Sequence, residues 1–328
     1  MKKKWLFAAL LISLLTFTLW RFDGESLLRS IHQIPLWLVV PLICLQVASQ
    51  LLVNTLWHQV AKLTCVSISF RQMLYINCQG AVVDAITLGV KFGGEVTRAV
   101  QISRTQNCTG QQAAIVVAMQ KLFSLSALFI IFLFTAGLLI YEVPFLQARY
   151  LQLLLYGVLM ILILSFLGIL LAPHYVRTYL QKVQSPRSRW RRRVRDFILA
   201  LLEKVETIRK APKRCGALFL LAFLIWLLYP AKLYLLVIQF VPNTSAAYVW
   251  SVAFLAYMVA MVPIFPGGIG GFEGTMTGLL VAIGFMINDA AVITVLFRFV
   301  TFWLVILLSL VFIAFHKFKC KKGHETAP

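Results

Sequence analysis

Seven ionisable side chains lie within long apolar stretches of this sequence, where a charge is costly. They are Asp84, Lys91, Glu95, Lys121, Lys232, Glu273 and Arg298. At the centre of a bilayer each would cost roughly 2.5–3.5 kcal/mol, so such groups persist where they pair, line a wet cavity or bind a charged ligand. Four cations against three anions leave one positive charge over, which would attract a phosphate in a low-dielectric cavity. Lys121 and Lys232 could instead extend to the membrane interface.

The first polar insert is the sequence GVKFGGEVTR at residues 89–98. Its glycines allow the backbone to turn sharply and to approach a ligand closely. Glu95 and Arg98 are three residues apart and can form a salt bridge on one helix. Alternatively, Arg98 and the unpaired amides at the start of that helix hold an anionic headgroup. The candidate binding residues of this insert are Lys91, Gly93, Gly94, Glu95 and Arg98.

The second insert, PIFPGGIGGFEG at residues 263–274, is the stronger motif. Two prolines and four glycines within nine residues cannot continue a helix. Non-helical backbone at membrane depth is tolerated only where it is buried in protein or lines a cavity. Glu273 could complement the dipole of the helix that follows, pair with Arg298, or couple its protonation to transport. The candidate binding residues are Pro266, Gly267, Gly268, Gly270, Gly271, Glu273 and Arg298.

The elements that must position these residues follow from the composition, because 61% of the 328 residues are hydrophobic. A soluble domain of this length would carry far more polar surface. The apolar runs are continuous rather than alternating, which favours helices over a barrel. We therefore expect an all-α polytopic integral membrane protein with about 6–8 transmembrane helices. The apolar segments are 5–20, 36–57, 72–90, 112–140, 150–172, 215–240, 247–264, 272–287 and 289–315.

The basic residues predict the orientation of the chain. The net charge is +20, from 31 Lys and Arg against 11 Asp and Glu. Basic clusters at residues 2–4, 177–214 and 317–322 match the bias of cytoplasmic loops, where they attract anionic lipid headgroups. We therefore expect a multi-pass protein of the cell inner (plasma) membrane with both termini cytoplasmic. This interpretation is favoured over nucleic-acid binding, and no nucleic-acid partner is predicted.

Two apolar segments fit this orientation only as halves of re-entrant hairpins. Segment 72–90 would descend from the cytoplasm and 95–105 would return. From the opposite side, 247–264 would enter and 272–287 would return after the glycine-rich turn. A long span follows each hairpin, which is the pattern of an inverted-topology repeat. Segment 247–264, at about 27 Å of helix, could also span the membrane by itself.

The two halves are predicted to form one transmembrane domain over residues 1–322. Its parts are a first half 1–172, a basic amphipathic linker 173–214, a second half 215–315 and a cytoplasmic tail 316–328. Within the linker, apolar residues from Trp190 to Ile208 recur at three- and four-residue steps, as on an interfacial helix. That helix could recruit anionic lipid, or simply anchor the connection between the halves.

Catalytic and metal-binding motifs are not found in the sequence. It contains no GxGxxG before a strand, no P-loop, no HExxH and no GxSxG, and its six cysteines and five histidines show no ligand spacing. We therefore expect no enzyme activity, no cofactor and no metal.

At its two inserts the chain resembles the flippase-like transmembrane domain of lysylphosphatidylglycerol synthases and of stand-alone bacterial and archaeal membrane proteins. The family has a turn ending in Gly-Glu with a downstream Arg, matched by Gly94, Glu95 and Arg98. A later turn, P-x-x-P-G-G-x-G-x-x-E, is followed about 25 residues on by an Arg. The matching residues here are Pro263, Pro266, Gly267, Gly268, Gly270, Glu273 and Arg298. The family's first-turn proline does not appear, and Gly89 stands about where it would be.

The resemblance implies translocation, or assistance in translocation, of phospholipid-like or polyprenyl-linked substrates between leaflets. The implied ligand is an anionic phospholipid or a polyprenyl-linked lipid, and a lipid-modifying enzyme is an expected partner. In bifunctional relatives a soluble domain performs aminoacyl transfer. Because the sequence ends soon after Lys322, we expect that activity to be absent here.

Three alternatives stay open at the level of sequence. One is a membrane-embedded transferase acting on a lipid-linked sugar. The second is a non-transporting scaffold whose basic helix binds anionic lipid or a partner enzyme. The third is a transporter of small anionic solutes, because the same inserts could bind any anion.

Overall fold

The computed structural model describes residues 35–64, 66–87, 92–104, 108–142, 173–182, 188–261 and 268–325, with scattered residues between 149 and 164. The described secondary structure is α-helical, with one π-helical turn. The predicted span 5–20 and most of 150–172 lie outside the described residues. Lys91, Pro266 and Gly267 lie outside them as well.

The described helices fall into two sets of four elements, separated by two further helices. The first set is α3 (Leu36–Leu63), α4 (Phe70–Ile86), α5 (Phe92–Ser103) and α6 (Gly110–Glu142). The separating helices are α8 (Pro173–Lys182) and α9 (Arg189–Arg209). The second set is α10 (Pro212–Val237), α11 (Ala246–Ala260), α12 (Gly271–Ala282) and a long helix made of α13 (Ile287–Arg298), the π-helical turn η2 (Phe299–Trp303) and α14 (Leu304–Glu325).

The long elements confirm the predicted fold class of an all-α polytopic membrane protein. Four of the described helices are long and apolar enough to cross a bilayer. They are Leu36–Leu63, Gly110–Thr135, Pro212–Val237 and Ile287–Phe318. Each set of four elements therefore begins and ends with a membrane-spanning helix.

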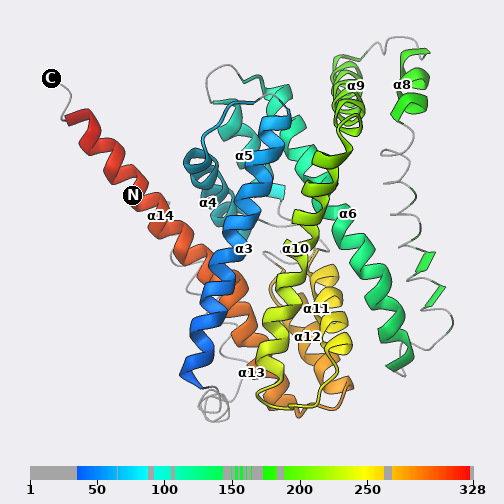
Figure 1. Ribbon diagram of the computed structural model, residues 1–328, viewed down its shortest axis with the longest axis vertical. Helices are drawn as coiled ribbons and strands as arrows, with labels where there is room; N and C mark the ends of the chain where they lie inside the picture. The colour runs from blue at the N-terminus through cyan, green and yellow to red at the C-terminus, as the bar shows by residue number, and fades with distance from the viewer. Residues whose placement is uncertain are drawn as a thin grey trace.

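Between its two long helices each set carries a helical hairpin. Helices α4 and α5 have 17 and 12 residues, and α11 and α12 have 15 and 12. At 1.5 Å per residue these reach about 18–26 Å, less than the roughly 30 Å of a hydrocarbon core. The α4–α5 hairpin lies toward the end of the molecule that carries α9, and the α11–α12 hairpin lies toward the opposite end (Figure 1). This is the inverted arrangement that the sequence pattern indicated.

The hairpins pack across the boundary between the two sets. Helix α4 packs on α14 of the second set, and α11 packs on α6 of the first, while α3 and α6 both contact α10. A small buried cluster joins the hairpin ends, with Ala85 from α4 and Ile269 from the second turn packed with Trp303 and Ile306. The end of α4 and the residue that precedes the start of α12 therefore meet inside the protein.

Local sequence explains where the hairpins begin. The Ser69 hydroxyl caps α4 by accepting a hydrogen bond from the Gln72 amide at 3.3 Å. Asn77 Nδ2 donates to Asn54 Oδ1 at 2.8 Å, which ties α4 to α3. Before α12, Gly270 has a φ of +89°, a conformation that side-chain-bearing residues rarely adopt.

Helix α9 packs on α6 and α10 through the second half of its predicted apolar stripe. Leu202, Val205 and Ile208 are buried there. Trp190 and Val194, in its first two turns, are exposed. The stripe thus has two parts, one covered by protein and one open to the surroundings.

Candidate functional site

The second insert places Glu273 against Arg298. Glu273 Oε1 lies 3.0 Å from Arg298 Nε, and the two side chains are only 13% and 8% exposed. The other carboxylate oxygen, Oε2, accepts a 2.7 Å hydrogen bond from the Gly270 amide at the start of α12. Glu273 therefore caps the helix and pairs with Arg298 at once, so two of the roles considered from the sequence are combined.

Aromatic rings complete the surroundings of Arg298. Its guanidinium carbon lies 4.8 Å from the centre of the Phe272 ring and 4.1 Å from that of Phe302. Arg298 is the last residue of α13 and directly precedes the π-helical turn. Cation–π contacts strengthen when the cation is desolvated, to about 2 kcal/mol. The two rings around Arg298 thus offset part of the cost of burying its charge.

In the first insert, Asp84 at the end of α4 holds the start of α5. Arg98 Nη1 donates a 3.0 Å hydrogen bond to Asp84 Oδ2, and the Gly94 amide donates to Oδ1 at 2.9 Å. The Arg98 guanidinium carbon also lies 5.4 Å from the centre of the Trp57 ring. A Cβ at Gly80 would lie 2.6 Å from that carbon, so a larger residue there would displace the Arg98 side chain.

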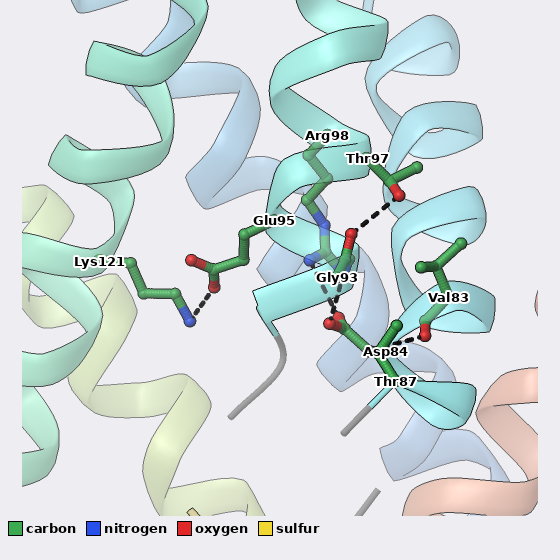
Figure 2. A network of polar contacts seen from close by, with 9 residues as sticks. Val83, Asp84, Thr87, Gly93, Glu95, Thr97, Arg98 and Lys121 are labelled. Atoms are coloured by element: carbon green, nitrogen blue, oxygen red, sulfur yellow. Dashed lines mark hydrogen bonds and ion pairs between the residues drawn. The ribbon is translucent and has the colours of Figure 1, made fainter. Parts of the chain in front are cut away.

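Glu95 pairs with Lys121 of α6, and this pair links the hairpin to the following span. Figure 2 shows the Glu95 and Arg98 side chains leaving α5 in different directions, toward Lys121 and toward Asp84. The salt bridge between Glu95 and Arg98 considered from their spacing is therefore not the pairing found. The reason is tertiary, because α5 lies between α4 and α6 and each neighbour supplies a partner of opposite charge.

A further buried charge, on Lys232 of α10, has neutral partners. Its Nζ donates to Gln46 Oε1 at 2.6 Å and to Ser49 Oγ at 3.1 Å, both on α3. The same nitrogen lies 4.5 Å from the centre of the Tyr229 ring. The Ser49 hydroxyl proton is directed to Leu45 O at 2.7 Å, so Ser49 Oγ acts as an acceptor toward Lys232. Two acceptors and one ring face thus surround the three hydrogens of the ammonium group.

Edge-on aromatic rings connect this lysine to the surroundings of Arg298. The Tyr229 ring centre lies 5.1 Å from that of Tyr257, which in turn lies 5.1 Å from that of Phe272. The Phe272 ring then contacts Arg298. Lys232 and Arg298 are therefore both buried beside one series of aromatic rings, and charges interact strongly in such an interior.

The predicted site residues fall into two groups at the hairpin ends. Gly93, Gly94, Glu95 and Arg98 lie at the start of α5, and Gly268, Gly270, Gly271 and Glu273 lie at the start of α12 near Arg298. The residues missed as site members were Asp84, Lys121 and Lys232, although each stood out as an ionisable residue in an apolar segment. Among the described residues, no group of His, Cys, Asp and Glu could hold a metal ion.

A fold of opposed helical hairpins, with ion pairs at their meeting ends, defines a polytopic membrane protein with a buried polar centre. The chain belongs to the family described as the lysylphosphatidylglycerol synthase TM region, whose model matches residues 5–309. It is 25% identical over 264 residues to a UPF0104 membrane protein of Methanothermobacter thermautotrophicus, covering 76% of each chain. It is 20% identical over 323 residues to a UPF0104 membrane protein of Pyrococcus horikoshii, covering 94% of this chain and 95% of that one.

Proposed function

We propose that this chain translocates an anionic phospholipid or polyprenyl-linked lipid across the cell inner membrane, with both of its own termini in the cytoplasm. The observation that carries the proposal is the Glu273–Arg298 pair, buried beside the point where the two hairpin ends meet. A cation paired with a carboxylate at such a position suits the capture of a lipid phosphate.

The geometry supports a simple exchange of anions at Arg298. An incoming phosphate would replace Glu273 as the partner of the guanidinium, whose planar donors suit phosphate oxygens. The displaced Glu273 would not be stranded, because its Oε2 already accepts from the Gly270 amide and the helix dipole favours a negative charge there. The acyl chains would stay in lipid while the headgroup crosses at the hairpin ends.

In this proposal Arg98 has a supporting role, because with Asp84 it fastens the end of α4 to α5. The sequence-based expectation that Lys91 and Arg98 also contact the headgroup stays a prediction. A lipid-modifying enzyme that supplies the substrate is the partner this function implies. The family description names the membrane region of a synthase, so the proposed role concerns the lipid rather than aminoacyl transfer.

A vesicle assay tests the proposal. The purified protein is reconstituted with fluorescent phosphatidylglycerol, and a membrane-impermeant quencher reports the lipid reaching the outer leaflet. Arg298→Ala and Glu273→Gln should each lower the rate at least tenfold, as expected for a loss of about 1.4 kcal/mol or more. Arg177→Ala is the matched control, because it removes the 2.9 Å Arg177–Glu206 ion pair between α8 and α9. Site variants that insert normally and move lipid at the parent rate would show the proposal to be wrong.

A further inference from the structure

The two ion pairs that link hairpins to long helices occupy corresponding places in the two sets of elements. Glu95 lies in the first turn of α5, and Lys121 follows 26 residues later on α6. Glu273 lies in the first turn of α12, and Arg298 follows 25 residues later at the end of α13. In each set the carboxylate stands on the returning helix of the hairpin and the cation on the helix that follows.

The contacts around the pairs follow the same correspondence. Helix α5 packs on α6 as α12 packs on α13, and the hairpin ends meet at the cluster of Ala85, Ile269, Trp303 and Ile306. The two hairpins enter from opposite ends of the molecule (Figure 1), and each carries one of the two pairs at the start of its returning helix. An inverted repeat places equivalent groups toward opposite leaflets.

From this correspondence we propose that Lys121 and Glu95 form a second binding station for a lipid phosphate, facing the leaflet opposite to the one served by Arg298 and Glu273. The inference rests on the proposed function and deepens it. It assigns to Lys121 the role that Arg298 has in the other half of the protein.

The chemistry of the station at Lys121 matches that of the station at Arg298. A phosphate arriving at Lys121 would take the place of Glu95. That carboxylate would remain in the first turn of α5, where the helix dipole stabilises a negative charge. The Lys121 side chain is 31% exposed, against 8% for Arg298, so the station at Lys121 is the more accessible of the two.

The two stations differ in how they would hold a phosphate. Arginine offers a planar fork of donors, while lysine is a compact point charge on a flexible stem. Arg298 also lies between two aromatic rings. The station at Lys121 should therefore bind and release headgroups faster than the station at Arg298.

The deciding experiment combines translocation with leaflet-specific photolabelling. The protein is inserted in one orientation into vesicles of phosphatidylglycerol and phosphatidylethanolamine, and a photoreactive phosphatidylglycerol is added to one leaflet at a time. Lys121→Met should lower translocation at least tenfold and lower labelling from one leaflet, with labelling from the other leaflet retained. Arg298→Met should show the opposite leaflet preference.

A second variant distinguishes loss of the binding station from a folding defect. Lys121→Met leaves Glu95 without its ion-pair partner, so Glu95→Gln/Lys121→Met removes both charges. It should insert like the parent and still lose translocation at least tenfold, whereas Lys121→Arg should retain it. If the double variant moves lipid at the parent rate, or if Lys121→Met lowers labelling equally from both leaflets, the second station is wrong while the proposed function stands. A parent protein that moves no lipid overturns the proposed function, and the station at Lys121 is then overturned unless the photolabelling shows the leaflet preference.

Discussion

The Gly94 amide donates a 2.9 Å hydrogen bond to Asp84 Oδ1, so the end of α4 is fastened to the backbone of α5. The other oxygen of the same carboxylate accepts from Arg98 at 3.0 Å. A Cβ at position 94 would lie 2.2 Å from the Asp84 carboxyl carbon, far inside van der Waals contact. Glycine at this position therefore allows one carboxylate to hold both the main chain and a side chain of the returning helix.

The first prediction is that Gly94→Ala breaks the link between Asp84 and the start of α5. The added methyl group must displace the Asp84 carboxylate, which loses its bond to the amide and strains the bond to Arg98. Hydrogen bonds to charged groups contribute about 1.5–3 kcal/mol, so we expect a loss of unfolding free energy of about 2 kcal/mol. Thermal unfolding in detergent micelles measures this. Gly216→Ala is the control, because a Cβ there meets nothing within 4 Å and alanine favours the helix. Equal unfolding temperatures for the two variants would contradict the prediction.

The elements were predictable wherever a local signal specified them. Long apolar runs predicted the spans, and the Pro- and Gly-rich insert at residues 263–274 predicted a helix break with Glu273 beside the new helix start. The pairing of Glu273 with Arg298 could be expected as well, because a deeply placed arginine needs a partner. Each of these inferences depends on a segment and its immediate neighbours.

The partners of the other buried charges are determined by tertiary packing. Whether Glu95 meets Arg98 or Lys121 depends on how α5 is rotated between α4 and α6, and spacing along one helix does not determine that. The partners of Lys232 on α3 are more than 180 residues away in the sequence and are uncharged. A search for carboxylates in the sequence could not have found them.

The second prediction concerns the turn before α12. Gly270 has φ +89° and ψ −50°, a region that costs other residues about 1–3 kcal/mol even though a Cβ there would meet nothing within 4 Å. Gly270→Ala should therefore lower stability by about that amount through the backbone alone, and it should also disturb the amide that Glu273 accepts from. Gly274→Ala, one turn further along α12 and equally open, should be neutral or stabilising by up to about 1 kcal/mol. Chemical denaturation of both variants in micelles checks the difference, and a stable Gly270→Ala would contradict the backbone argument.

The third prediction is a double-mutant cycle on Lys232 and Gln46. Gln46→Leu deprives a buried ammonium of its 2.6 Å acceptor, and leaving such a group unsatisfied costs about 1–3 kcal/mol or more. The double variant Gln46→Leu/Lys232→Met removes the charge together with its acceptor, so it should be at least as stable as the parent. The two changes should be strongly non-additive, with a coupling of about 1–3 kcal/mol in thermal or denaturant unfolding. Additive effects would show that the contact contributes little.

The fourth prediction addresses the π-helical turn between Arg298 and the hairpin ends. A turn with i→i+5 hydrogen bonds holds one residue more than an α-helical turn, and such turns often mark functional sites. Here the widened turn begins directly after Arg298 and ends at Trp303, which packs against Ala85 and Ile269. A turn of this kind can change its hydrogen bonding more cheaply than a regular helix can. The π-helical turn would therefore let the hairpin ends move when a headgroup phosphate replaces Glu273 as the partner of Arg298.

Deleting Thr301, a half-buried residue of that turn, should convert it to continuous α-helix while the flanking faces keep their orientation. Stability in micelles should be unchanged or higher. Translocation should fall at least tenfold, because the helix could no longer change its hydrogen bonding beside Arg298. Deleting Leu308 from regular α14 is the contrasting variant, since it rotates the rest of that helix by about 100° and should lower stability. Parent-rate translocation by the Thr301 deletion would mean that the π-helical turn is only a packing feature.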